Sequence, residues 1–310
     1  MRLIANCKKI WSVRRALGAL AVLGLATSPA LAEQPQPWQM GLLPAASEVR
    51  DRVDYLHNYI LMPIITVITL FVLGLLLYVM VRFNGKRNPV PSKISHNTVL
   101  ELAWTTIPII ILLVIAIPSF KLLYFEDKTA HADLTLKVTG HQWYWSYEYP
   151  DQQLASFDSH ILTNDNGEAI GNPRLLQVDS PVVLPVHKNV RILVEGSDVI
   201  HSWFMPSFGV QEYAVVGRTN ESWVNIDREG VYYGQCNQIC GVNHPFMPIE
   251  VLGVSAEKFT SWTACTKAAK DDDKAKAACY KPLEADIAKT EKVAAKDGAA
   301  VTVAANAAQQ

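Results

Sequence analysis

Two long apolar stretches near the start of the chain constrain its fold more than any other feature. Residues 60–81 are almost entirely apolar, and so are residues 103–124, in which Lys121 is the one charged residue. Each stretch reaches the roughly 20 residues that a helix needs to cross a bilayer. A buried core helix would explain one such stretch, but two in one chain favour a membrane hairpin. The sequence therefore predicts two transmembrane helices within residues 55–125.

The first 32 residues have the composition of a secretory signal peptide. Basic side chains precede a short apolar run over residues 16–25, and a small-x-small sequence ends at Ala32. This order is typical of a cleaved export signal, and its form here indicates a bacterial source. We expect cleavage after Ala32, which leaves residues 33–54 as an exported N-terminal segment.

The connection between the two apolar stretches is basic. It carries Arg82, Lys86, Arg87 and Lys93, and no acidic residue precedes Glu101. Short cytoplasmic loops of membrane proteins carry an excess of Lys and Arg, so we place this loop in the cytoplasm. Both ends of the mature chain then lie in the periplasm, on a multi-pass protein of the bacterial inner membrane.

Residues 126–256 have the pattern of an exported all-β domain. Runs of β-branched and aromatic residues alternate with turn residues such as Gly140 and Gly196. We expect strands at 133–149, 175–184, 190–200, 221–233 and 247–252. This pattern predicts one small sandwich or barrel.

The charge of this domain limits its partners. Residues 133–254 contain fourteen acidic and six basic side chains, a net charge of −8. Such a surface repels nucleic acid and attracts a basic partner, although it would also serve solubility alone.

The remaining residues, 257–310, are rich in Ala and Lys. We expect them to be helical in pieces and otherwise disordered. Cys265 and Cys279 lie here, and an oxidising compartment allows a disulfide between them. The sequence leaves this pairing open.

One short segment concentrates soft metal ligands. Cys236, Cys240, His244 and Met247 fall within twelve residues, and His201 at the end of an apolar run can supply a second imidazole. Sulfur together with imidazole favours copper, whereas carboxylates would suit magnesium or calcium.

Several kinds of site compete for this segment. Cys236 and Cys240 can form a disulfide in an exported domain. A structural zinc site would use four Cys and His ligands and leave the Met superfluous. A blue-copper site uses one Cys, so this segment has one Cys too many. The second thiolate is accounted for if two metal ions share two bridging sulfurs.

The ligand pattern, His201 followed by Cys236-x-x-x-Cys240-x-x-x-His244-x-x-Met247, resembles the binuclear copper A loop of subunit II of haem–copper cytochrome c oxidases. The likeness covers nearly the whole mature chain. The two apolar spans and the segments 140–149, 197–203, 217–220 and 233–236 follow in the same order. The resemblance implies a two-helix transmembrane hairpin plus an all-β Greek-key cupredoxin sandwich, with the copper A domain at residues 126–256.

The resemblance also implies a ligand set for two copper ions. Cys236 and Cys240 bridge the coppers, His201 and His244 each bind one, and Met247 and the backbone carbonyl of Gln238 are weak ligands. The family usually has Glu at position 238, whose carboxylate reaches a magnesium ion shared with subunit I. Gln238 keeps the carbonyl but loses the charge, which disfavours magnesium there because hard cations prefer ionised oxygen ligands.

Electrons and protons enter the family's subunit at separate places. By resemblance, Trp143 receives the electron from cytochrome c, and Glu148, Asp179 and Asp198 steer the basic cytochrome. Glu101, at the start of the second span, has two expected roles, and one does not exclude the other. It completes a capping box that begins at Thr98, or it admits protons to a channel of subunit I.

The implied function is that of subunit II of a respiratory cytochrome c oxidase. It would take electrons from cytochrome c and pass them to haem in subunit I, where oxygen becomes water and protons are translocated. The implied partners are subunits I and III, cytochrome c and membrane lipid. No Cys-x-x-Cys-His occurs, so no c-type haem is expected.

Two other classes of protein share part of this pattern. A quinol oxidase subunit II shares the anchor and the sandwich but has lost copper, which the intact ligand set argues against. A membrane-anchored copper-binding or copper-carrier module outside an oxidase would not need the aromatic segment around Trp143.

Overall fold

The computed structural model describes residues 35, 38–90, 92–127, 131–171, 173–270, 272–287 and 289. The predicted signal peptide and residues 290–310 lie outside the described residues. The chain divides into two units, residues 33–283 and a second unit of residues 1–32 with 284–310. The elements that carry the argument below all belong to the first unit.

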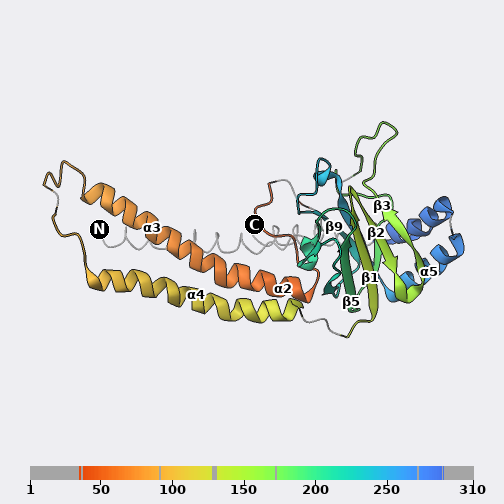
Figure 1. Ribbon diagram of the computed structural model, residues 1–310, viewed down its shortest axis with the longest axis horizontal. Helices are drawn as coiled ribbons and strands as arrows, with labels where there is room; N and C mark the ends of the chain where they lie inside the picture. Colours follow the sequence, from red (N-terminus) through yellow and green to blue (C-terminus); the bar gives the residue numbers. More distant parts are fainter. Residues whose placement is uncertain are drawn as a thin grey trace, which may run out of the picture. The chain divides into compact units, whose positions relative to one another are not determined.

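Two long helices correspond to the two predicted spans (Figure 1). The first is continuous through α2 (Glu48–Tyr55), a π-helical segment (Leu56–Leu61) and α3 (Met62–Arg82), and the second is α4 (Thr98–Asp127). Both are long and apolar enough to cross a membrane. Among the described residues, neither α3 nor α4 buries a side chain, so their apolar surface needs lipid or other helices around it. The guanidinium of Arg52 lies 3.5 Å from the centre of the Phe125 ring and ties the two helices together at one end.

The N-terminus of α4 corrects one prediction. Oδ1 of Asn97 accepts hydrogen bonds from the amides of Val99 and Leu100 at 3.1 and 3.2 Å, and a carboxylate oxygen of Glu101 accepts from the amide of Asn97 at 3.3 Å. The cap is therefore Asn97, and the capping box predicted to begin at Thr98 is wrong by one residue. Glu101 does reach back to the helix start, as expected of a carboxylate in the first turn.

Residues 134–254 form a sandwich of two five-stranded sheets, as predicted (Figure 1). The strands are β1 (Leu134–His141), β2 (Tyr144–Tyr149), β3 (Leu154–Ser159), β4 (Val182–Pro185), β5 (Val190–Gly196), β6 (His201–Met205), β7 (Val210–Ala214), β8 (Asn220–Val224), β9 (Gly230–Cys236) and β10 (Pro248–Val254). One sheet has the order β3-β2-β1-β5-β8 and the other β4-β10-β9-β6-β7. The parallel pairs β1/β5 and β4/β10 show that the chain crosses between sheets instead of folding as successive hairpins.

Most predicted strands were too long. The run 133–149 is two strands joined by a turn at Gln142 and Trp143, and the run 221–233 is interrupted between β8 and β9. Neither Gln142 nor Trp143 is a turn-forming residue type, so the alternating pattern hid the reversal. Gly140, predicted to mark a turn, instead lies inside β1 opposite Trp145. The runs 175–184 and 190–200 shorten to β4 and β5, whereas the run 247–252 corresponds to the slightly longer β10. Strands β3, β6 and β7 were not predicted.

Aromatic residues of β2 and β6 join the two sheets in the core. Trp203 and Tyr147 are buried, and Nε1 of Trp203 donates to the Tyr147 hydroxyl at 3.4 Å. The hydroxyl of Tyr149 donates to the carbonyl of Val183 at 2.9 Å and accepts from its amide at 3.0 Å. Burial raises the pKa of both tyrosines, so these groups stay neutral and hydrogen-bonded inside the sandwich.

The C-terminal part contains α5 (Ala256–Ala269) and a further helix over residues 273–287, so the predicted helical pieces are confirmed. Trp262 of α5 packs edge-on against Tyr149 with the ring centres 5.4 Å apart. A disulfide joins Cys265 and Cys279 across a separation of 14 residues. Closing a loop of that size stabilises the fold by about 3 kcal/mol in the chain-entropy view.

Candidate metal centre

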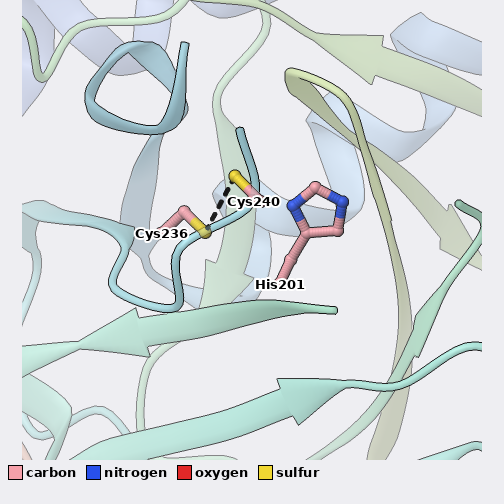
Figure 2. A group of neighbouring side chains, drawn as sticks. All are labelled: His201, Cys236 and Cys240. Atoms are coloured by element: carbon pink, nitrogen blue, oxygen red, sulfur yellow. Dashed lines mark hydrogen bonds between the residues drawn. The ribbon is translucent and has the colours of Figure 1, made fainter. Parts of the chain in front are cut away.

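Two neighbouring strands bring the distant metal-ligand candidates together. His201 is the first residue of β6, Cys236 is the last residue of β9, and Cys240 lies in the loop that follows. The strands are paired through Trp203 and Cys236, which sets the imidazole beside the thiols. Figure 2 shows these three side chains converging from the strand ends and the loop.

The geometry is that of a compact cluster. One ligand atom from each of His201, Cys236 and Cys240 lies within 4.8 Å of the others, and all three residues are buried. The two sulfurs are 3.8 Å apart and are not joined as a disulfide. Nδ1 of His244 lies 3.5 Å from the sulfur of Cys240. Four of the six predicted ligand residues therefore meet in one place.

The two predicted weak ligands lie next to this cluster. The thiol of Cys236 donates to the carbonyl of Gln238 at 3.3 Å. Met247 is 1% exposed, and its carbonyl accepts from the amide of Cys236 at 3.0 Å. The backbone of the loop is thus folded back around Cys236.

The two thiols differ in acidity. Burial alone would raise the pKa of Cys236, but contacts with His201 and with the backbone of Ser202 and Gln238 lower it to about 7. Burial and the adjacent Cys236 raise the pKa of Cys240 to about 12. Cys236 is therefore the first of the pair to become a thiolate, which is the form that binds metals.

His201 shows that the cluster fits a soft metal. Its Nε2 lies 2.8 Å from Oδ1 of Asp198, and an ionised carboxylate only accepts, so Nε2 carries the proton. Nδ1 is buried and has no hydrogen-bond partner within the described part of the chain. A buried imidazole nitrogen beside two buried thiols is a donor set of the kind that copper or zinc prefers.

Gly140 of β1 lies directly against this imidazole, a role that sequence reasoning missed. A Cβ at position 140 would lie 2.9 Å from Cδ2 of His201 and 3.1 Å from its Cβ and Cγ. Only a residue without a side chain fits here unless the ring moves.

Gly140→Ala is therefore expected to displace His201 and to lower the free energy of unfolding by about 1–3 kcal/mol. Urea unfolding of the detergent-solubilised chain, followed by tryptophan fluorescence, measures this. Gly230→Ala is the control, because its added Cβ would meet the Tyr232 side chain at ordinary distances of 3.5–3.8 Å. Equal stability of the two variants would contradict the expectation.

Trp143 links the surface to the thiol loop. It lies in the β1–β2 turn, is half-buried, and its Nε1 donates to the carbonyl of Cys240 at 3.2 Å. The side-chain amide of Gln142 donates to the same carbonyl at 2.7 Å. Gly241 has a φ of 123°, and an added Cβ would lie 3.0 Å from the indole. Sequence reasoning singled out Trp143 but missed Gln142 and Gly241, because their roles depend on contacts between distant segments.

The predicted steering acids lie in unlike surroundings. Glu148 is on the outer face of β2 opposite Lys137, and Asp179 accepts from the amide of His160 at 2.9 Å at the surface. Asp198 instead contacts the buried imidazole of His201. Glu101 lies at the start of α4, in the membrane hairpin.

Comparison with known proteins agrees with this architecture. The family model for the cytochrome c oxidase subunit II transmembrane domain matches residues 35–122, and that for its periplasmic domain matches residues 134–254. A probable cytochrome c oxidase subunit 2 of Rickettsia bellii is 48% identical over 242 residues, which are 78% of this chain and 89% of the relative. Cytochrome c oxidase subunit 2 of Cereibacter sphaeroides is 41% identical over 263 residues, or 79% and 86% of the two chains.

Among solved structures, the periplasmic domain of subunit II of cytochrome oxidase of Bradyrhizobium japonicum is 45% identical. The match covers 46% of this chain and 98% of that one, with a TM-score of 0.43. Both family domains match in order over most of the sequence, and the two relatives align along most of their own length. The chain therefore belongs to the cytochrome c oxidase subunit II family.

Proposed function

We propose that this chain accepts electrons from cytochrome c at a binuclear copper centre and passes them to haem in subunit I of a respiratory oxidase, which reduces oxygen to water and translocates protons. The observation that carries the proposal is the unpartnered Nδ1 of His201 beside the thiols of Cys236 and Cys240. Family membership supports the oxidase context.

The donor set fits copper better than zinc. In the proposed assignment Cys236, Cys240, His201 and His244 would hold two copper ions, and Met247 and the carbonyl of Gln238 would be weak ligands. Copper held by soft ligands supplies a centre that exchanges one electron at a time. The chain contributes a buried site that excludes water, and a loop whose backbone is hydrogen-bonded to β9 and to the β1–β2 turn.

Trp143 is the proposed point where electrons enter. Its half-buried indole is in reach of a docked protein, and its hydrogen bond to the Cys240 carbonyl gives a short connection to a thiol ligand. The acidic domain supplies attraction for a basic cytochrome.

The copper domain and both mature termini are proposed to be periplasmic. The exposed apolar faces of α3 and α4 would contact lipid and the helices of subunits I and III. The Gln238 side chain is not proposed to bind magnesium, because it has no carboxylate.

Copper content and the EPR spectrum of the full chain, purified in detergent and reconstituted with copper, test the proposal. We expect two coppers per chain and a multiline EPR spectrum from one unpaired electron shared by the two coppers. We also expect cytochrome c to reduce this copper. One copper with the spectrum of a single ion, or zinc alone, would rule out the binuclear centre. Copper that cytochrome c does not reduce would favour the copper-carrier alternative.

Glu148→Gln and Asp179→Asn are each expected to slow association with cytochrome c several-fold at low ionic strength and little at high ionic strength. The physical reason is that exposed charges steer an encounter only within the Debye length, about 8 Å at physiological salt. Stopped-flow reduction across a salt series measures this. Glu168→Gln, at an exposed turn outside the proposed docking set, is the control. A loss that persists unchanged at high salt would contradict steering.

Glu101→Ala is expected to slow proton-coupled turnover of the oxidase while copper is still reduced at the normal rate. Asn97→Ala is the matched control, because it removes the helix cap at a cost of about 1 kcal/mol and keeps the carboxylate. Oxygen consumption and copper reduction are measured together on both variants. If Asn97→Ala slows turnover as much as Glu101→Ala, the carboxylate acts only through the helix terminus.

A further inference from the structure

Asp198 is tied to three separate backbone or side-chain donors around the metal centre. Its Oδ1 accepts from Nε2 of His201 at 2.8 Å and from the amide of Val199 at 2.6 Å. Its Oδ2 accepts from the amide of Gln142 at 2.7 Å. Both carboxylate oxygens are therefore used inside the protein, and the side chain is only 33% exposed.

We propose that Asp198 is a positioning residue, which fixes the tautomer and orientation of His201 and holds the Gln142–Trp143 turn against the thiol loop. The proposal rests on the proposed copper function and adds a specific role for this carboxylate. It differs from the steering role that the family resemblance implies for the same residue.

The first step of the argument concerns the imidazole. A carboxylate accepts and cannot donate, so it selects the His201 tautomer with the proton on Nε2. The lone pair then lies on Nδ1, the buried nitrogen that has no partner among the described residues. Without the carboxylate, either tautomer would be allowed, and the one with the proton on Nδ1 cannot bind a metal at that atom.

The second step concerns the turn that carries Trp143. The backbone amide of Gln142 donates to Asp198, while its side-chain amide donates to the carbonyl of Cys240 at 2.7 Å. The turn is thus held from two sides, by the residue that orients His201 and by the loop that carries the thiols. Removing the carboxylate frees one side of the turn and, with it, the indole of Trp143.

The other acids make no comparable contact. Glu148 lies opposite Lys137 on the outer face of β2, and Asp179 bonds to His160 at the surface. Asp179→Asn and Asp198→Asn each remove one negative charge, so both variants should weaken electrostatic steering equally. Only Asp198→Asn also changes a contact with His201.

The first measurement needs no copper. NMR of the full chain in detergent, labelled with 15N-histidine, reports which ring nitrogen of His201 carries the proton. The spectra are recorded at a pH where the ring is neutral. Asp198→Asn is expected to shift the Nδ1 resonance from the unprotonated toward the protonated range, because an amide can donate as well as accept. Asp179→Asn is expected to leave it unchanged, and Asp198→Glu to retain the native tautomer.

The second measurement is copper binding. Asp198→Asn is expected to lose about 10- to 100-fold in copper affinity, the usual effect of removing the partner of a ligating histidine, and to change the hyperfine splitting in EPR. Circular dichroism confirms that each variant is folded, and Asp198→Glu keeps an acceptor-only side chain if Asp198→Asn does not fold.

The outcomes separate the alternatives. A native His201 tautomer, native copper affinity and a salt dependence like that of Asp179→Asn would overturn the positioning role and leave steering alone. If the wild-type chain binds no copper, the proposed function fails, but a tautomer change in copper-free Asp198→Asn still supports positioning and an unchanged tautomer still refutes it.

Discussion

Cys236→Ser is expected to abolish the binuclear copper centre and, with it, electron acceptance from cytochrome c. Cys236 is the more acidic thiol of the pair, with a pKa of about 7, so at neutral pH it supplies the first thiolate to an incoming metal. A serine hydroxyl is hard and stays protonated, so it cannot replace a bridging sulfur. Copper per chain, the EPR spectrum and the rate of reduction by cytochrome c measure the loss.

The double variant Cys265→Ser/Cys279→Ser is the control for this experiment. It also removes cysteine sulfur from the exported part, but at the disulfide beside α5 and not at the metal centre. It should keep full copper content while losing about 3 kcal/mol of stability. A Cys236→Ser protein that retains two coppers with the native spectrum would show that the bridging assignment is wrong.

Trp203→Ala is expected to lower the free energy of unfolding by about 3–5 kcal/mol, a large share of the roughly 5–15 kcal/mol that holds a domain folded. Trp203 is fully buried, pairs with Cys236 across β6 and β9, and hydrogen-bonds to Tyr147 of the other sheet. Its loss leaves a cavity between the sheets.

Urea unfolding of the copper-free chain in detergent, followed by circular dichroism, measures this cost. Val242→Ala is the control, because Val242 is 84% exposed and its truncation should change stability by less than about 0.5 kcal/mol. A Trp203→Ala protein as stable as the control would mean that the sheets close over the vacated space.

The sequence alone was informative wherever a property depends on local composition. Residues 60–81 and 103–124 predicted membrane helices because apolar length is sufficient for that conclusion. The structure then extended both helices through capping residues that hydropathy cannot detect, such as Ser47 and Asn97. Strand boundaries were less predictable, because the Gln142–Trp143 turn contains no residue type that marks a turn.

The ligand candidates at the metal centre were determined by the sequence, since five of the six are neighbours in one short loop and the distant His201 follows a recognisable run. What only the tertiary structure decided is how those atoms are presented. The hydrogen bond from the Gln142 amide to Asp198, the space that Gly140 leaves for the His201 ring and the hydrogen bond from the Gln142 side chain to the Cys240 carbonyl all join segments that are far apart in the chain. Such contacts depend on how two sheets pack, and local residue patterns do not encode that packing.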